Sequence, residues 1–329
     1  MAAMSDRNLA DRHGRKIDYL RVSVTDRCDL RCNYCIPKGH REFGERSGVL
    51  DAGEFARLVG LFAGLGVSRV RLTGGEPLTR ADLVPIVEAV GTIAGISDIS
   101  LSTNATRLAD RAAALLAAGV RRLNVSLDSL RREVFAGVTG RDCLDDVLHG
   151  LELAAGLGFA PIKINMVVQA GVNDTEVGAM VDYCRRRGFV LRLIEQMPVG
   201  AAEKVDFVGL QAIRRELVET HGLVDALVPG GGPARYLRSP QGDITVGFIT
   251  PMSQHFCATC NRLRLGADGS LFTCLDAAGS VPLGAHMRGG ASDEVLLAMI
   301  RAAVWSRPAE HRFDAPRDRS IRSMAVTGG

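Results

Sequence analysis

Six of the eight cysteines fall into two groups of three, at spacings suited to metal ligands. Cys28, Cys32 and Cys35 lie within eight residues and follow an apolar run at 19–24 that predicts a strand. Iron–sulfur clusters are usually held by four cysteines, so three would leave one iron open to another ligand. An open position is typical of a catalytic metal site. The alternative is a structural zinc site with a more distant fourth ligand, for which His40 is the nearest candidate.

The second group comprises Cys257, Cys260 and Cys274. A Cys-x2-Cys pair with a later cysteine across a hairpin is also common in structural zinc sites, so zinc remains an alternative here. Arg262 and Arg264 follow the pair and alternate along a predicted strand, which places both guanidinium groups on one face. Guanidinium groups bind phosphate oxygens bidentately, which favours a phosphate ligand beside the metal over a solvated basic strand edge.

Apolar strands and amphipathic helices must position these cysteines. Residues 51–54 have the spacing of a capping box, and an apolar periodicity of helical type follows them. The pattern predicts six strands, at 19–24, 68–73, 99–103, 123–127, 162–168 and 190–194. Helices are predicted between them, including 81–94, 108–118 and 175–187. This alternation indicates parallel βα units, although the pattern does not distinguish an open sheet from a barrel.

The chain changes character after residue 198. A helix at 208–221 and a Gly/Pro-rich linker at 229–233 precede four short strands and a last helix at 293–305. The strands are expected at 236–237, 244–249, 263–265 and 271–273, with an Asp-Gly turn before the last one.

Composition excludes several classes of protein. The chain has 329 residues and a formal net charge of +3, which does not suggest a nucleic-acid-binding protein. No apolar run is long enough to span a membrane, and the polar residues at 1–16 do not resemble a signal peptide. Clustered cysteines predict metal binding in a reducing compartment, so we expect a cytoplasmic protein.

The motifs resemble a known family. Cys-x3-Cys-x2-Cys with Tyr34 before the last cysteine is similar to the loop of radical S-adenosylmethionine (SAM) enzymes. Four longer segments resemble the GTP 3′,8-cyclase family within that superfamily, at 21–28, 71–78, 124–130 and 256–265. The resemblance implies an α/β fold, a partial (β/α)6 radical SAM barrel with a C-terminal α+β extension. It divides the chain into an N-terminal arm (1–18), the barrel (19–198) and an auxiliary-cluster domain with a Gly-Gly tail (199–329).

The resemblance also implies cofactors and site residues. Each cysteine triad would hold one [4Fe–4S] cluster, and no side chain is assigned a catalytic role. The residues implied to contact SAM are Tyr34, Gly75, Ser126 and Met197. Those implied to bind GTP are Arg21, Arg71, Ser102, Lys163, Arg262, Leu263 and Arg264, and Arg192 is a plausible addition. Without the resemblance, the glycine would be read as part of a tight turn and the methionine as core.

Four of the implied GTP ligands interrupt strands that otherwise look buried: Arg21, Arg71, Lys163 and Arg192. A buried cation needs an anionic partner. Internal pairing is the structural alternative, and one such pair is expected, with Glu195 or Asp128. Four cations at one end of a barrel fit a triphosphate better.

The implied activity is the first step of molybdenum-cofactor biosynthesis. An adenosyl radical removes hydrogen from C3′ of GTP, the ribose radical attacks C8 of guanine, and the product radical is reduced. The implied partners are GTP, an external electron donor (flavodoxin-like or chemical) and the next enzyme, cyclic pyranopterin monophosphate synthase. A homodimer is a candidate assembly, and neither nucleic acid nor membrane is an expected partner. The rival functions are a radical SAM peptide-modifying maturase and a zinc-stabilised binding module.

Some positions depart from the family pattern or lie outside the motifs. Asp29, Ile36 and Ala105 stand where Asn, Met and Gly are usual, and none of them is a cluster ligand. The final residues, Gly328 and Gly329, would by default be a disordered end, whereas in the family this tail reaches the active site. Cys143 and Cys184 lack cluster spacing, and Cys184 shares a helical stripe with apolar residues that predicts a core position.

Overall fold

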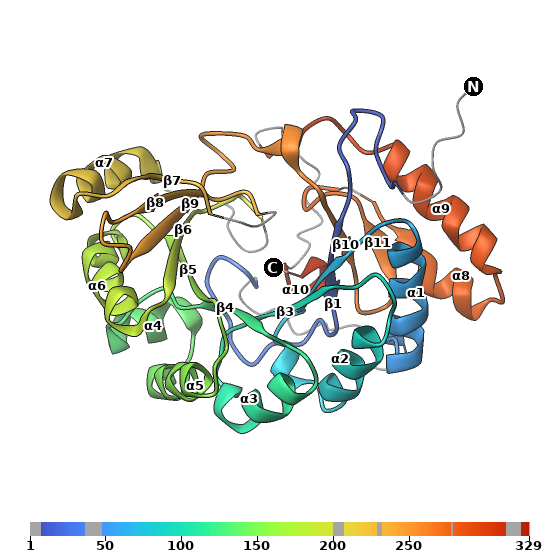
Figure 1. Cartoon of the computed structure of the whole chain (residues 1–329), viewed down its shortest axis with the longest axis horizontal. Coiled ribbons are helices and arrows are strands. Elements are labelled where there is room, and N and C mark those ends of the chain that lie inside the picture. Colours follow the sequence, from blue (N-terminus) through green and yellow to red (C-terminus); the bar gives the residue numbers. More distant parts are fainter. Residues whose placement is uncertain are drawn as a thin grey trace.

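Six parallel strands lie side by side in chain order. The computed structural model describes residues 8–36, 48–199, 207–228, 232–277, 279–313 and 324–328. The six strands are β1 (Tyr19–Ser23), β2 (Arg69–Thr73), β3 (Asp98–Thr103), β4 (Arg122–Ser126), β5 (Ile162–Val168) and β6 (Val190–Glu195). Helices on the outside of this curved sheet connect them (Figure 1). They are α1 (Ala52–Gly64), α2 (Leu83–Gly91), α3 (Leu108–Ala117), α4 (Arg132–Thr139), α5 (Leu144–Gly156) and α6 (Val177–Arg187). The partial (β/α)6 barrel is therefore confirmed.

The C-terminal part extends both edges of the same sheet. At one edge β10 (Arg262–Leu265) pairs in parallel with β1, and β11 (Ser270–Phe272) and β12 (Val281–Pro282) continue outward. At the other edge β9 (Thr245–Ile249) pairs in parallel with β6, followed by β8 (Arg235–Arg238) and β7 (Val224–Ala226). Twelve strands thus form one continuous sheet. The helices of this part are α7 (Leu210–His221), α8 (Leu283–Arg288), α9 (Asp293–Trp305) and α10 (Met324–Thr327).

Local sequence chemistry accounts for most of these elements. Helix α1 begins at a capping box in which Asp51 accepts from the backbone N–H of Glu54 and the Glu54 carboxylate accepts from the backbone N–H of Asp51. Its apolar stripe includes Phe55 and Phe62, both fully buried against the sheet. Cys143 and Cys184 are also buried, as expected. The elements β7, β12, α8 and α10 were not predicted, because two to six residues are too few to establish a periodicity.

The N-terminal arm is packed where the structure describes it. Residues 8–18 form a turn with a bridge between Ala10 and Lys16, and Leu9 and Ile17 are buried. The backbone N–H of Leu9 donates to the carbonyl of Leu65 at 3.0 Å, which fastens the turn to the end of α1. This arm is therefore part of the fold around the barrel.

Candidate functional site

Both cysteine triads line one cavity of about 300 Å³. The first triad lies on the loop after β1, and two cysteines of the second lie in the short 3-10 helix Cys257–Thr259 and its cap just before β10. Because β10 pairs in parallel with β1, the cysteine segment before β10 lies at the start of this strand pair and the first cysteine loop lies at its end. The two triads therefore line the shared cavity from opposite ends of these strands.

Backbone contacts hold the first cysteine loop. The N–H of Leu30 donates to Sγ of Cys28 at 3.4 Å, and the N–H of Cys35 donates to the carbonyl of Cys32 at 3.0 Å. The N–H of Arg31 donates to the carbonyl of Thr139 at the end of α4. Burial raises the pKa of Cys28 and of Cys35 to about 12, so these thiols keep their protons until a metal replaces them. Three partly buried thiols on one loop fit an iron–sulfur cluster.

Asp128 positions Tyr34 beside this loop. The Tyr34 hydroxyl donates to Oδ2 of Asp128 at 2.8 Å, and the N–H of Val167 donates to Oδ1 at 2.8 Å. Burial raises the pKa of Asp128 to about 6. Glu195 is occupied as well, since the N–H groups of Met252 and Ser253 donate to its Oε2 at 3.0 Å. Internal pairing of a strand cation with either of these two carboxylates, which were the expected examples, is therefore wrong, because Asp128 holds Tyr34 and strand β5 and Glu195 holds the turn at 252–253.

Gly75 is required by the cysteine loop itself. A Cβ at this position would lie 2.3 Å from the carbonyl oxygen of Arg27, and the N–H of Gly75 donates to the carbonyl of Thr25 at 2.7 Å. The next residue, Glu76, is buried and accepts from the Asn104 N–H at 2.6 Å. Burial raises the pKa of Glu76 to about 7. The close approach expected at this glycine thus serves the cysteine loop, while Gly75 also lines the cavity.

The second triad has a cationic setting. Nη2 of Arg307 donates to Sγ of Cys260 at 3.0 Å, and Nη2 of Arg262 does so at 3.6 Å. Burial opposes ionisation of this thiol, but the charges of Arg262 and Arg307 outweigh it and lower the pKa of Cys260 to about 6. A cysteine that ionises so readily is a suitable metal ligand.

Two histidines adjoin the same triad. Donor atoms of His255, Cys257 and His311 lie within 4.8 Å of one another, and the two imidazole rings stack with centroids 4.5 Å apart. A Cys/His donor set also suits zinc. By its donors the second triad therefore fits a cluster, and together with the two histidines it also fits zinc.

Most predicted SAM and GTP residues line the cavity that holds the triads. They are Tyr34, Gly75, Ser126 and Met197 for SAM, and Arg21, Arg71, Ser102, Arg192, Arg262 and Arg264 for GTP. Leu263 is fully buried in the hydrophobic core and, by strand alternation, faces away from Arg262 and Arg264. Its side chain therefore belongs to the core.

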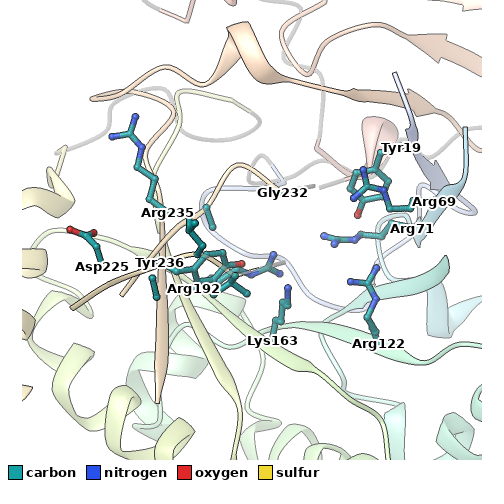
Figure 2. A pocket seen from close by; sticks show the side chains of 14 residues that line it. Tyr19, Arg69, Arg71, Arg122, Lys163, Arg192, Asp225, Gly232, Arg235 and Tyr236 are labelled. Carbon is teal, nitrogen blue, oxygen red and sulfur yellow. The ribbon is translucent and has the colours of Figure 1, made fainter. Parts of the chain in front are cut away.

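Lys163 lines a second cavity of about 440 Å³ that shares Arg71 and Arg192 with the first. The side chains of Arg71, Arg122, Lys163 and Arg192 converge on it from β2, β4, β5 and β6 (Figure 2). Arg122 forms an ion pair with Asp98. Burial and the charges of Arg192, Arg122 and Arg71 lower the pKa of Lys163 to about 8.

Burial and the neighbouring positive charges also act on Arg192. Its pKa is lowered to about 10 by burial and by the charge of Arg71, and its guanidinium donates to Oδ1 of Asn124. Mutually repelling cations around one cavity are stabilised by a polyanion. The two neighbouring cavities are therefore complementary to a ligand that carries several phosphates.

The end of the chain reaches the same region. Helix α10 lies inside the curve of the sheet (Figure 1), and Nη1 of Arg264 donates to the carbonyls of Thr327, at 3.2 Å, and Gly328. The hydroxyl of Ser23 donates to the carbonyl of Ala325 at 3.3 Å. The tail therefore touches one of the predicted GTP ligands, while Gly329 lies outside the described residues.

Sequence reasoning missed Arg15 and Arg307, which both line the cavity. Arg15 lies in the N-terminal arm and Arg307 follows α9, and neither belongs to a motif that would have indicated it. Asn104 was noted only as the end of a strand, yet its side-chain amide lies 3.9 Å from Sγ of Cys28.

Comparisons with known proteins agree with this geometry. Residues 22–184 match the Radical SAM superfamily and residues 189–313 match Molybdenum Cofactor Synthesis C. The chain is 41% identical to a GTP 3′,8-cyclase of Ectopseudomonas mendocina (strain ymp), over 99% of this chain and all of that protein. It is 43% identical to a GTP 3′,8-cyclase of Heliobacterium modesticaldum (strain ATCC 51547 / Ice1), over 98% of this chain and all of that one.

A solved structure shares the fold. Streptococcus suis SuiB bound to S-adenosylmethionine superposes with a TM-score of 0.63 and 16% identity, over 88% of this chain and 69% of that chain. Within the described residues, no helix is both long and apolar enough to cross a bilayer. Identity near 40% along the whole chain, together with both cysteine triads on one cavity, shows that the chain belongs to the GTP 3′,8-cyclase family of radical SAM enzymes.

Proposed function

We propose that the protein is a radical SAM lyase that converts GTP to (8S)-3′,8-cyclo-7,8-dihydroguanosine 5′-triphosphate. The observation that carries this proposal is a single cavity lined by two cysteine triads, which shares Arg71 and Arg192 with a second cavity lined with cations. The identity to GTP 3′,8-cyclases along the whole chain supports the same reaction.

The first triad is proposed to hold the cluster that binds SAM. With SAM bound, that cluster supplies the electron whose transfer generates an adenosyl radical. The protein contributes position. Gly75 fixes the cysteine loop against β2, and Asp128 holds Tyr34 through a 2.8 Å hydrogen bond. Ser126, at the end of β4, and Met197, after β6, line the same cavity and are proposed SAM contacts.

GTP is proposed to lie with its base toward the second triad and its phosphates among the cations. Arg262 and Arg264 line the same cavity as that triad, and Arg71 and Arg192 line both cavities. Lys163 is then a ligand for the far end of the triphosphate, since it lines the second cavity. Binding orients the ribose so that one hydrogen meets the radical.

The second triad is proposed to hold a second [4Fe–4S] cluster, on Cys257, Cys260 and Cys274. The anionic tendency of the Cys260 thiol supports a metal there. Zinc on the Cys/His group of His255, Cys257 and His311 is the alternative. An external electron donor, transfer of the product to cyclic pyranopterin monophosphate synthase, a homodimer and a cytoplasmic location all stay predictions.

The decisive experiment is anaerobic turnover of the reconstituted protein with SAM, a reductant and GTP. We expect 5′-deoxyadenosine to form only when GTP is present, together with a cyclised nucleotide. Cys260→Ser should cleave SAM slowly and make no cyclised nucleotide. Cys143→Ser, at a buried cysteine outside both triads, is the matched control and should keep activity. Zinc without iron in the purified protein, or full activity of Cys260→Ser, would contradict the two-cluster reading.

A further inference from the structure

Three buried charged side chains connect the N-terminal arm to the second cysteine triad. The exposed fractions of the Asp11, Arg15 and Arg307 side chains are 0%, 5% and 3%. Asp11 lies between the two arginines: its Oδ2 is 2.5 Å from Nε of Arg15 and 3.8 Å from Nη1 of Arg307. Such a buried group of charges is costly to form and needs compensating contacts.

Arg307 finds those contacts on a cluster cysteine. Its Nη1 donates to the carbonyl of Cys260 at 2.9 Å and its Nη2 donates to Sγ of the same residue at 3.0 Å. The two nitrogens of one planar guanidinium therefore fix both the backbone and the sulfur of Cys260. A lysine ammonium group is a point charge without this pair of coplanar nitrogens, so it does not reproduce both hydrogen bonds in the same geometry.

Arg15 links the N-terminal arm to the same cysteine segment. Its Nη1 donates to the carbonyls of Cys257, at 2.9 Å, and Ala309, at 2.7 Å, and its Nη2 donates to the carbonyl of Pro308 at 2.6 Å. Asp11, through Nε of Arg15, sets the direction of this guanidinium. These contacts hold together the N-terminal arm, the segment of Cys257 and Cys260, and the chain after α9. Arg307 therefore cannot turn away from the sulfur without losing its contacts to Asp11 and Cys260.

The first triad has charged neighbours of the opposite sign. Glu76 and Asp29 act on Cys28, and Asp128 acts on Cys32 and Cys35. The second triad instead faces guanidinium groups. A cluster gains negative charge on reduction, so nearby cations and N–H donors to its sulfurs favour the reduced form.

We propose that Arg307, oriented by Asp11 and Arg15, is a positioning residue that raises the reduction potential of a cluster on the second triad through its hydrogen bond to Sγ of Cys260. The inference rests on the proposed second cluster. Because the charges around the two cysteine sites differ in sign, we expect a cluster at the second site to have a higher reduction potential than a cluster at the first.

The test is a redox titration of the full-length chain followed by electron paramagnetic resonance. The Cys28→Ser, Cys32→Ser, Cys35→Ser background leaves only the second triad to bind a cluster, and iron per chain is measured first. Arg307→Gln is then compared with the background at the same iron content. At a fixed potential we expect about a tenfold higher ratio of oxidised to reduced cluster, which is a potential about 59 mV lower for one electron. Arg12→Gln is the same change at an exposed position of the N-terminal turn that carries Asp11 and Arg15, and it should leave the reduction potential unchanged.

Each outcome has a distinct meaning. An unchanged potential in Arg307→Gln with the cluster retained would overturn the inference, because a purely structural role alters iron content only. If Arg307→Gln loses its cluster, Arg307→Lys is measured in its place. Lysine keeps the positive charge but lacks the paired guanidinium nitrogens, so the reduction potential of the cluster should fall by less than about 59 mV. An unaltered reduction potential in Arg307→Lys would refute the proposal. A background protein without any iron would instead contradict the second cluster itself, and the inference with it.

Discussion

The charge of Lys163 should make GTP binding depend on pH between pH 7 and pH 9. Its pKa is lowered to about 8 because it is buried and faces Arg192, Arg122 and Arg71. The free protein therefore carries the charge in about 90% of molecules at pH 7 and in about 10% at pH 9. The phosphates of GTP lose their last protons near pH ~6, so the charge of the triphosphate is constant over this range.

Bound triphosphate would keep Lys163 protonated, because an adjacent anion raises the pKa of an ammonium group. Binding then requires the protonated form, and the dissociation constant is divided by the fraction of protein in that form. The affinity for GTP is therefore highest below pH 8 and falls above it. The dissociation constant should rise about tenfold from pH 7 to pH 9, equivalent to about 1.4 kcal/mol.

Anaerobic isothermal titration calorimetry with GTP at pH 7, 8 and 9 measures this directly. Lys163→Arg keeps the charge over the whole range, so its dissociation constant should vary little with pH. Lys163→Gln should bind weakly at every pH. A constant affinity in the parent protein, or an equal loss of affinity in Lys163→Arg, would refute the assignment of this pH dependence to Lys163.

Three further changes test local features of the fold. Ala105 has a φ of 63°, so Ala105→Gly should raise the free energy of unfolding by about 1 kcal/mol in chemical denaturation, and a loss would contradict the strain. Tyr34→Phe leaves the buried Asp128 without its 2.8 Å donor, and stability at pH 8 should fall by about 1–3 kcal/mol, with a smaller fall at pH 5, where Asp128 (pKa about 6) is protonated. Gly75→Ala puts a methyl group against the carbonyl of Arg27, and iron bound per chain should drop sharply; unchanged iron would contradict this close contact.

The spacing of residues in the chain was enough to predict two metal-binding cysteine triads and a parallel βα array, while the barrel and the radical chemistry followed from the resemblance to a known family. Cysteine triads, the capping box at Asp51 and the alternation of strands and helices are all local patterns, set by side-chain geometry over a few residues. Residues 162–168 and 293–305 form the predicted strand and helix with the predicted bounds. Where local patterns were short, as in β7 and α8, prediction failed because periodicity needs more residues than these elements contain.

Only the tertiary structure decided what these local elements do together. The parallel pairing of β10 with β1 places the two triads around one cavity, and no local pattern encodes a strand pairing between opposite ends of a chain. The same folding places Lys163 in its own cavity and Leu263 in the core, and it brings Asp11, Arg15 and Arg307 around Cys260. Residue types determine which chemistry is available, whereas burial and long-range strand pairing determine which groups face one another, because those contacts depend on the closure of the whole sheet.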